Sequence, residues 1–231
     1  MDAKRLERNK EMPRVCAMYC DTMHRLKIRQ KPARDCFARL ALRYAEPHRH
    51  YRTLSRVLHC LEQLSPHSES ANNLDALVMA IIYQDAVCDT TAFQGNEEKS
   101  AKYWLFDAEQ VLEIGDKKFV KEVARLIRLT AHHQVDASLD SDGALFLDVC
   151  WAILAEDAEV YDSYADRLRL EYPRLKTFDD WAFARVVIFI DPLLCQDRIF
   201  HSRHFGDREE QRAKANLMEE RFRYQHLLPI P

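Results

Sequence analysis

The chain has 231 residues, of which 47% are hydrophobic and 31% are charged, and its formal net charge is −3. Its four glycines leave no Gly-rich turn of the kind that parallel α/β nucleotide-binding folds require, and the slight negative charge gives no indication of a nucleic-acid partner. There is no apolar run of about 18 residues and no start resembling a signal peptide, and the seven cysteines are odd in number, so we expect a cytoplasmic protein with free thiols and no membrane span.

The pattern of apolar residues predicts a series of helices behind a charged N-terminal extension, residues 1–12. Apolar side chains recur at spacings of three and four, which is typical of amphipathic helices, and no stretch alternates with a period of two. We expect all-α architecture, a single helical-bundle domain over residues 13–231, with Asn96 as the N-cap of a helix that begins at residue 97. The other predicted helices span about 13–29, 33–44, 46–65, 74–85, 117–133, 143–157, 161–172, 181–194 and 208–226.

Two strongly apolar helices each carry a carboxylate. Asp85 follows Gln84 at the end of the 74–85 helix, and Asp148 lies in the middle of LFLDVCWAIL. A buried carboxylate needs a cation, a metal ion or a hydrogen-bond donor as its partner. For Asp85 the alternatives are a neighbouring arginine or an open surface, and for Asp148 a salt bridge to an arginine such as Arg169.

Histidines and arginines on other predicted helices offer partners for these acids. His132 and His133 end the 117–133 helix, while Arg52 and Arg56 precede His59 on the 46–65 helix. Carboxylates and histidines that arrive from different helices are what a metal site in a helical bundle requires. Equally, histidines at a helix end often cap carbonyl groups, and arginines often belong to a solvated face.

A second candidate metal site lies near the N-terminus. Cys16, Cys20 and His24 recur at a spacing of four, so a helix would place them on one face. No matching second cluster of ligands is evident, and buried cysteines are common in helices, so we do not expect zinc there.

The order of segments resembles a family of small bacterial-type proteins, metal-dependent phosphohydrolases of the HD superfamily. The resemblance spans about residues 40–220 and implies an all-helical bundle in which an H…HD…D set of side chains holds a divalent cation. The segments that carry it are YAEPHRHYRTLSRV at 44–57, AIIYQDAVCD at 80–89, NEEKSA at 96–101, LTAHH at 129–133, LFLDVCWAILAED at 145–157, YDSY at 161–164, LRLEY at 168–172 and Glu209, Ala213, Asn216 and Leu217 near the C-terminus.

The expected metal ligands are where this chain departs from the family. Both histidines of a Y-H-x-L-x-H segment are replaced, by Arg52 and Arg56, and the His-Asp pair of the family is Gln84-Asp85 here. In the Asp-x-Asp-Leu segment, Cys150 stands in place of the second aspartate. Arginine cannot ligate a cation and glutamine is a weak ligand, so the resemblance implies a site in which a fixed positive charge replaces the metal.

The leading hypothesis is therefore a catalytically inactive relative, without a cofactor, that binds a nucleotide or another phosphorylated small molecule, or a protein. Its residues are Asp85 and Gln84 at the former catalytic position and, for ligand binding, Arg52, Arg56, His132, His133 and Asp148. One alternative is a working hydrolase with a divalent ion (Mn, Fe, Mg or Zn) held by a rearranged set, Asp85, Asp148, His59 and His133. Another is an interaction module whose pocket has collapsed around an Arg56–Asp85 pair. The sequence leaves the oligomeric state open.

Overall fold

The computed structural model describes residues 10–91 and 95–227, and every regular element within these two ranges is helical. The predicted all-α fold is confirmed. Most of the proposed N-terminal extension, residues 1–9, lies outside the described part of the chain. The α-helices are α2 (Met12–Arg25), α3 (Gln30–Tyr44), α4 (Leu54–Leu64), α5 (Leu74–Tyr83), α6 (Asn96–Phe106), α7 (Lys117–Leu129), α8 (Ser141–Trp151), α9 (Ala158–Arg169), α10 (Phe178–Ala184), α11 (Asp191–Leu194) and α12 (Asp207–Tyr224).

Short helical turns of other types extend several of these helices. Turns of 3-10 helix follow α4 (Ser65–Ser70), α8 (Ala152–Ala155) and α12 (Gln225–Leu227). Turns of π-helix follow α6 (Asp107–Val111) and α10 (Arg185–Ile190). No helix within the described residues is long and apolar enough to cross a membrane.

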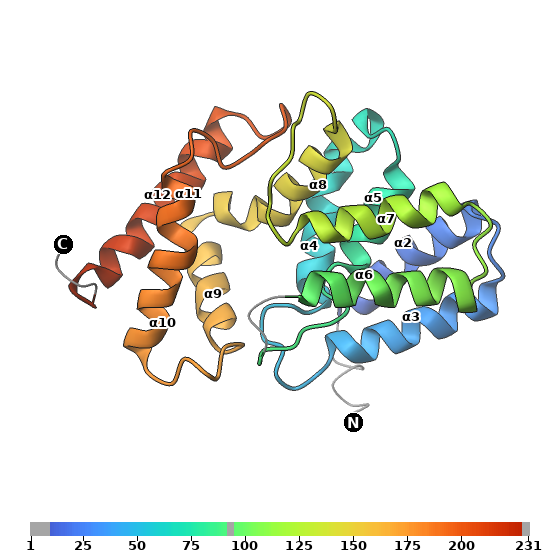
Figure 1. Cartoon of the computed structure of the whole chain (residues 1–231), viewed down its shortest axis with the longest axis horizontal. Coiled ribbons are helices and arrows are strands. Elements are labelled where there is room, and N and C mark those ends of the chain that lie inside the picture. Colours follow the sequence, from blue (N-terminus) through green and yellow to red (C-terminus); the bar gives the residue numbers. More distant parts are fainter. Residues whose placement is uncertain (1–9, 92–94, 228–231) are drawn as a thin grey trace.

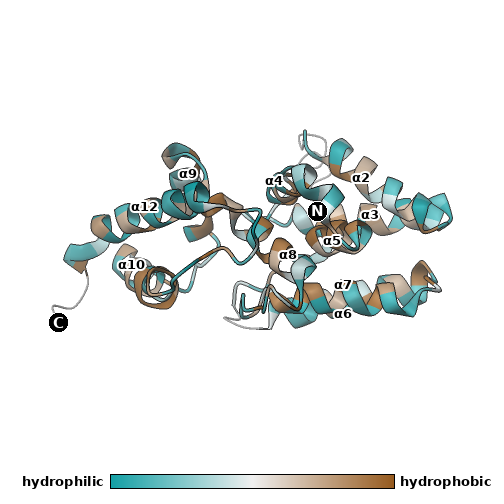
Figure 2. Cartoon of the chain, turned by 90° about the horizontal axis from the view of Figure 1, so that it is seen from above, coloured by the Kyte–Doolittle hydropathy of each residue, from teal (hydrophilic) through white to brown (hydrophobic). Residues whose placement is uncertain are grey.

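Helix α5 forms the centre of the fold. All of its residues from Ala76 to Tyr83 are buried, and it packs against α2, α4, α6, α7 and α8. A helix that is apolar on every side is stable only when other helices surround it, as they do here. Figure 2 shows the hydrophobic colour concentrated on α5 and α8, whereas α12 is mostly hydrophilic.

The helices form two groups that share one hydrophobic core. Helices α2 to α8 lie together, and α9 to α12 lie beside them (Figure 1). Helix α8, which is buried from Asp142 to Cys150, runs on through the 3-10 turn Ala152–Ala155 to connect the groups. The buried hydrophobic cluster is continuous from Val15 in α2 to Leu217 in α12. Residues 10–91 and 95–227 therefore form one domain.

The prediction of a helix from residue 46 is wrong, because α4 begins only at Leu54. The preceding segment instead wraps around Arg49, whose fully buried side chain donates hydrogen bonds to the Glu46 carboxylate at 3.0 Å and to the Asp85 carbonyl at 2.6 Å. These bonds compensate the burial of a guanidinium group. They also hold the segment against the end of α5.

Other helix boundaries differ by a few residues. Asn96 is the first residue of α6 rather than its N-cap; Gly95, at a φ of +91°, precedes it, and the Asn96 side chain accepts from the Asp89 amide. Helix α7 ends at Leu129, four residues before His133, whose positive φ of 47° reverses the chain. The 181–194 helix starts earlier, at Phe178, because Thr177 caps it.

Candidate functional site

A cavity of about 320 Å³ lies between the two groups of helices. Its size is that of pockets that hold small ligands. One wall comes from the turn before α4 and from the ends of α5, α7 and α8, and the facing wall comes from α9 and from α10 with its π-turn. Aromatic rings supply much of its lining: Tyr51, Trp151, Tyr164, Tyr172, Trp181 and Phe189.

Two arginines and one carboxylate face each other at the polar end of this cavity. The Asp85 carboxylate lies 3.1 Å from Nη1 of Arg56 and 3.5 Å from Nε of Arg52. Nε of Arg56 is buried without a hydrogen-bond partner. Oδ2 of Asp85 forms an ion pair with Arg56, but no donor is oriented to form a hydrogen bond with it. Burial acts to lower the pKa of Arg56, but Asp85 together with the nearby Tyr51, Cys60 and Cys150 outweighs it, so the pKa is raised and the guanidinium stays charged.

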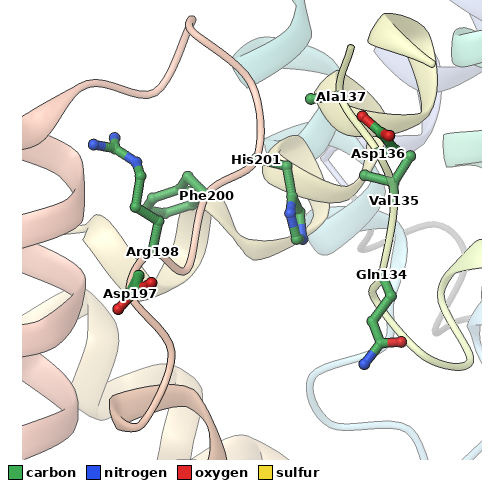
Figure 3. A pocket seen from close by; sticks show the side chains of 8 residues that line it. All are labelled: Gln134, Val135, Asp136, Ala137, Asp197, Arg198, Phe200 and His201. Atoms are coloured by element: carbon green, nitrogen blue, oxygen red, sulfur yellow. The ribbon is translucent and has the colours of Figure 1, made fainter. Parts of the chain in front are cut away.

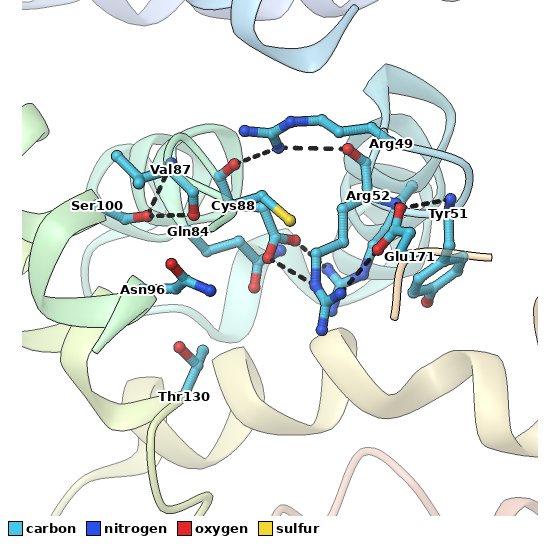
Figure 4. Close-up of polar contacts among 12 residues, drawn as sticks. Arg49, Tyr51, Arg52, Gln84, Val87, Cys88, Asn96, Ser100, Thr130 and Glu171 are labelled. Atoms are coloured by element: carbon cyan, nitrogen blue, oxygen red, sulfur yellow. Dashed lines mark hydrogen bonds and ion pairs between the residues drawn. The ribbon is translucent and has the colours of Figure 1, made fainter. Parts of the chain in front are cut away.

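Glu171 holds Arg52 in place, a role that the sequence patterns did not indicate. Its carboxylate is fully buried and accepts hydrogen bonds from the backbone N–H groups of residues 50, 51 and 52 at 2.7 to 2.8 Å. Its second oxygen accepts from Nη1 of Arg52 at 2.7 Å (Figure 4). This arrangement joins the loop after α9 to the turn before α4. Only a carboxylate has enough acceptor sites for all four donors.

Gln84 connects the polar end of the cavity to two cysteines. Its Oε1 accepts from the Cys150 thiol at 2.9 Å, and its Nε2 lies 4.0 Å from Sγ of Cys60. Arg56 approaches the same Cys60 sulfur at 3.9 Å. Three of the four positions at which this chain departs from the expected metal ligands, Arg56, Gln84 and Cys150, therefore lie around Cys60 and close to Asp85.

His133 also lines the cavity, with a neutral ring. Its imidazole stacks on Trp151 at 4.0 Å between ring centroids, and its Nε2 is buried without a partner. Burial lowers its pKa to about 3, and the positive charge of Arg56 acts in the same direction. An unpartnered polar atom in a cavity wall is a position where a ligand atom can bond.

Three of the predicted site residues lie elsewhere. His132 is exposed and does not line the cavity, because the chain reverses at the next residue. His59 pairs with Glu156 at 2.8 Å. Asp148 accepts from the backbone N–H groups of His201 and Ser202, at 2.7 and 2.6 Å, so its partners belong to the loop before α12 and the proposed salt bridge to Arg169 is not formed.

The rearranged metal site does not assemble in the described residues. No group of three or more His, Cys, Asp or Glu side chains within 10–91 and 95–227 is placed to hold a metal ion. Asp85 and His133 share the cavity, but Asp148 and His59 have the other partners described above. The Cys16 and Cys20 thiols contact each other at 4.0 Å without forming such a group with His24.

A second, open hollow lies on the surface behind His133. Figure 3 shows it between residues 134–137 and residues 197–201, with His201 at its edge. Nε2 of His201 lies 3.0 Å from the carbonyl oxygen of His133. Together with Asp148, which holds the His201 backbone, this contact fixes the loop that carries His133.

Comparison with protein-family models, with curated proteins and with solved structures found no match to this chain.

Proposed function

We propose that this chain binds a phosphorylated small molecule, such as a nucleotide, in the cavity between the two groups of helices. Arg52 and Arg56 bind the anionic group, and the aromatic wall packs on the remainder of the ligand. The observation that carries the proposal is the unpartnered Nε of Arg56, a buried charged donor beside a cavity of about 320 Å³. Guanidinium groups bind phosphate through paired, charge-assisted hydrogen bonds.

The polar groups of the cavity suit a ligand that both accepts and donates hydrogen bonds. Arg56 offers a donor, while Nε2 of His133 and Oδ2 of Asp85 lack hydrogen-bond donors. A phosphorylated sugar or nucleoside has phosphate oxygens for the first and hydroxyl groups for the other two. The ring of Tyr172, with Arg52 stacked 5.7 Å from its centroid, and the other aromatic side chains give the apolar part of such a ligand a surface to cover.

The side chains around Asp85 support a proposal of binding rather than hydrolysis. In the proposed family the aspartate would hold a metal ion that lowers the pKa of a bound water. Here two guanidinium groups take that position, and Gln84 contacts cysteines instead of completing a ligand set. We therefore assign Asp85 and Gln84 the role of orienting Arg56 and Cys150.

A collapsed interaction module is the weaker candidate. Its sign would be an Arg56–Asp85 pair with no space beside it. The pair is formed, at 3.1 Å, but the cavity beside it remains large enough for a ligand. Partner proteins and the oligomeric state therefore do not enter the proposal.

The test is a titration of the full chain with inorganic phosphate, ribose 5-phosphate and the nucleoside 5′-monophosphates, followed by calorimetry and by thermal denaturation. At least one organic phosphate should bind and raise the melting temperature, since a ligand that binds only the folded state stabilises it. Arg56→Gln should weaken that binding by about tenfold or more, because a charge-assisted hydrogen bond contributes about 1.5 to 3 kcal/mol. The exposed Arg203→Gln is the matched control and should bind as the wild type does. No binding of any of these probes, or equal binding by both variants, would refute the proposal.

A further inference from the structure

Cys60 and Cys150 lie near the polar end of the cavity, whose lining includes Cys150 and also Cys88. Cys60 comes from α4 and Cys150 from α8, two helices that pack against each other. The carboxamide of Gln84 contacts both sulfurs: its Nε2 lies 4.0 Å from Sγ of Cys60, and its Oε1 accepts from the Cys150 thiol at 2.9 Å. Two residues that are 90 positions apart in the sequence thus bring their sulfur atoms to the same carboxamide.

We propose that Cys60 and Cys150, the second of which lines the cavity, form an oxidisable thiol pair that hydrogen peroxide converts to an intramolecular disulfide. The proposal is independent of the ligand, because it concerns only the two sulfurs and their access through the cavity. It assigns a modification site to side chains that otherwise would be ordinary core cysteines.

The surroundings distinguish Cys60 from an inert buried thiol. Nη1 of Arg56 lies 3.9 Å from its sulfur, and His59 is its neighbour in the chain. The neighbouring Cys150 thiol lowers the pKa of Cys60 well below its ordinary value, and Arg56 and His59 add to this effect against the opposing effect of burial. Cys36 is equally buried and has Arg39 at 3.2 Å from its sulfur, but burial and the nearby Asp107 outweigh this arginine and raise its pKa to about 11. Reactive cysteines lie near positive charges, whereas those in apolar surroundings are unreactive.

The cavity gives the oxidant a route to the pair. Cys150 is one of the residues that line it, although only 2% of its surface is exposed. Hydrogen peroxide has only two heavy atoms, so a cavity of about 320 Å³ admits it readily. Larger disulfide oxidants do not have this advantage.

The reaction balances with peroxide as its only oxidant. The thiolate sulfur of Cys60 attacks one peroxide oxygen, so that an S–O bond forms, the O–O bond breaks and hydroxide leaves to take up a proton as water. The sulfur of Cys150 then attacks the sulfenic acid, forming the S–S bond and breaking the S–O bond. The thiol proton leaves with the second water, so two thiols and one peroxide give one disulfide and two waters.

The disulfide would change the wall of the cavity. Cys150 would no longer donate to Oε1 of Gln84, because its thiol hydrogen is lost in the reaction. A covalent bond would also join α4 to α8. Reduction by a dithiol reagent restores both thiols, since a disulfide, unlike a sulfinic acid, is reversible.

The experiment is peroxide treatment of the folded full chain, alkylation of the remaining thiols, and digestion without reductant. Trypsin should yield a cross-linked pair of peptides, residues 57–99 and 129–167, whose mass is lower than the sum of the two by two hydrogen atoms. Because residues 57–99 contain Cys88 as well as Cys60, Cys88→Ser is the matched control and should keep the cross-link, whereas Cys60→Ser should lose it.

A second digestion keeps the result decisive if Cys60→Ser fails to fold. Chymotrypsin cleaves after Tyr83 and so separates Cys60 from Cys88 in the wild-type protein itself. The proposal is overturned if Cys60 and Cys150 are recovered unlinked under conditions that oxidise the exposed Cys195. It is also overturned if the cross-link joins Cys88 rather than Cys60 to Cys150.

Discussion

Acidification should destabilise the protein through His133, and the size of the effect follows from the structure. In the folded chain burial lowers the pKa of His133 to about 3, while an unfolded chain has the ordinary value of about 6.5. Below pH 6.5 the unfolded chain therefore takes up a proton at residue 133 that the folded chain does not bind. Stability falls as the pH falls from about 6.5 to about 3, by about 1.4 kcal/mol per pH unit.

Between pH 7.5 and pH 5.0 this one group should cost about 2 kcal/mol, a sizeable part of a typical free energy of unfolding of about 5 to 15 kcal/mol. The assay is urea denaturation at both pH values, followed by circular dichroism. His133→Asn carries no titrating ring, and asparagine tolerates the positive φ of 47° better than most residues. In that variant the loss of unfolding free energy between pH 7.5 and pH 5.0 should be smaller by about 2 kcal/mol.

The exposed neighbour His132 supplies the control. In His132→Asn the free energy of unfolding should change between the two pH values by as much as it does in the wild type. The reasoning is refuted if His133→Asn loses as much stability on acidification as the wild type. Such a result would mean that the imidazole takes up its proton in the folded state. His133 would then carry a positive charge beside Arg56.

Three further predictions concern the contacts around the cavity. Glu171→Gln should lower the free energy of unfolding in urea by about 3 kcal/mol, because it removes a buried charge that accepts from three backbone N–H groups and an arginine. Asp148→Asn should lower it by about 1 to 3 kcal/mol, because an amide has one acceptor oxygen for two backbone donors. The triple variant Arg56→His, Gln84→His and Cys150→Asp should bind Mn²⁺ or Zn²⁺ near one equivalent, measured by elemental analysis, if the cavity corresponds to the metal site of the proposed family.

Exposed carboxylates on α9, the helix that precedes Glu171, provide the comparison for the effect of Glu171→Gln on stability. Glu159→Gln and Asp166→Asn should change the free energy of unfolding by no more than about 0.5 kcal/mol. Equal stability of Glu171→Gln and Glu159→Gln would contradict the role given to the buried carboxylate. A folded triple variant without bound metal would count against the resemblance.

The fold could be predicted from the sequence because each long helix carries its own signal. The apolar residues of α5 and α8 leave them no stable position except the interior, and prolines and polar loops mark most boundaries. The wrong prediction of a helix over residues 46–53 has a physical origin. An arginine such as Arg49 is usually exposed, but here its buried side chain donates hydrogen bonds to carbonyl groups, and these bonds keep the segment from forming a helix. No local pattern reports bonds between residues more than 30 positions apart.

The candidate site was predictable only in part, for the same reason. The resemblance placed Arg56 beside Asp85, and the two side chains form an ion pair at 3.1 Å. Glu171 is 119 positions from Arg52 and ends a helix as an ordinary surface residue would, so only the structure reveals its role. His132 and His133 are indistinguishable in sequence, and the reversal of the chain at the second one determines which faces the cavity.

The charges around Asp85 determine how an anion would bind. Arg52 and Arg56 carry two positive charges and Asp85 and Glu171 carry two negative ones, so this end of the cavity is neutral when it is empty. A phosphate must therefore compete with Asp85 for Arg56, and the two anions repel each other. At a separation of about 5 Å and an effective dielectric constant of about 20 the repulsion is about 3 kcal/mol. Asp85→Asn should consequently bind inorganic phosphate at least about tenfold more tightly in calorimetry, and equal or weaker binding by this variant would refute the repulsion between Asp85 and the phosphate.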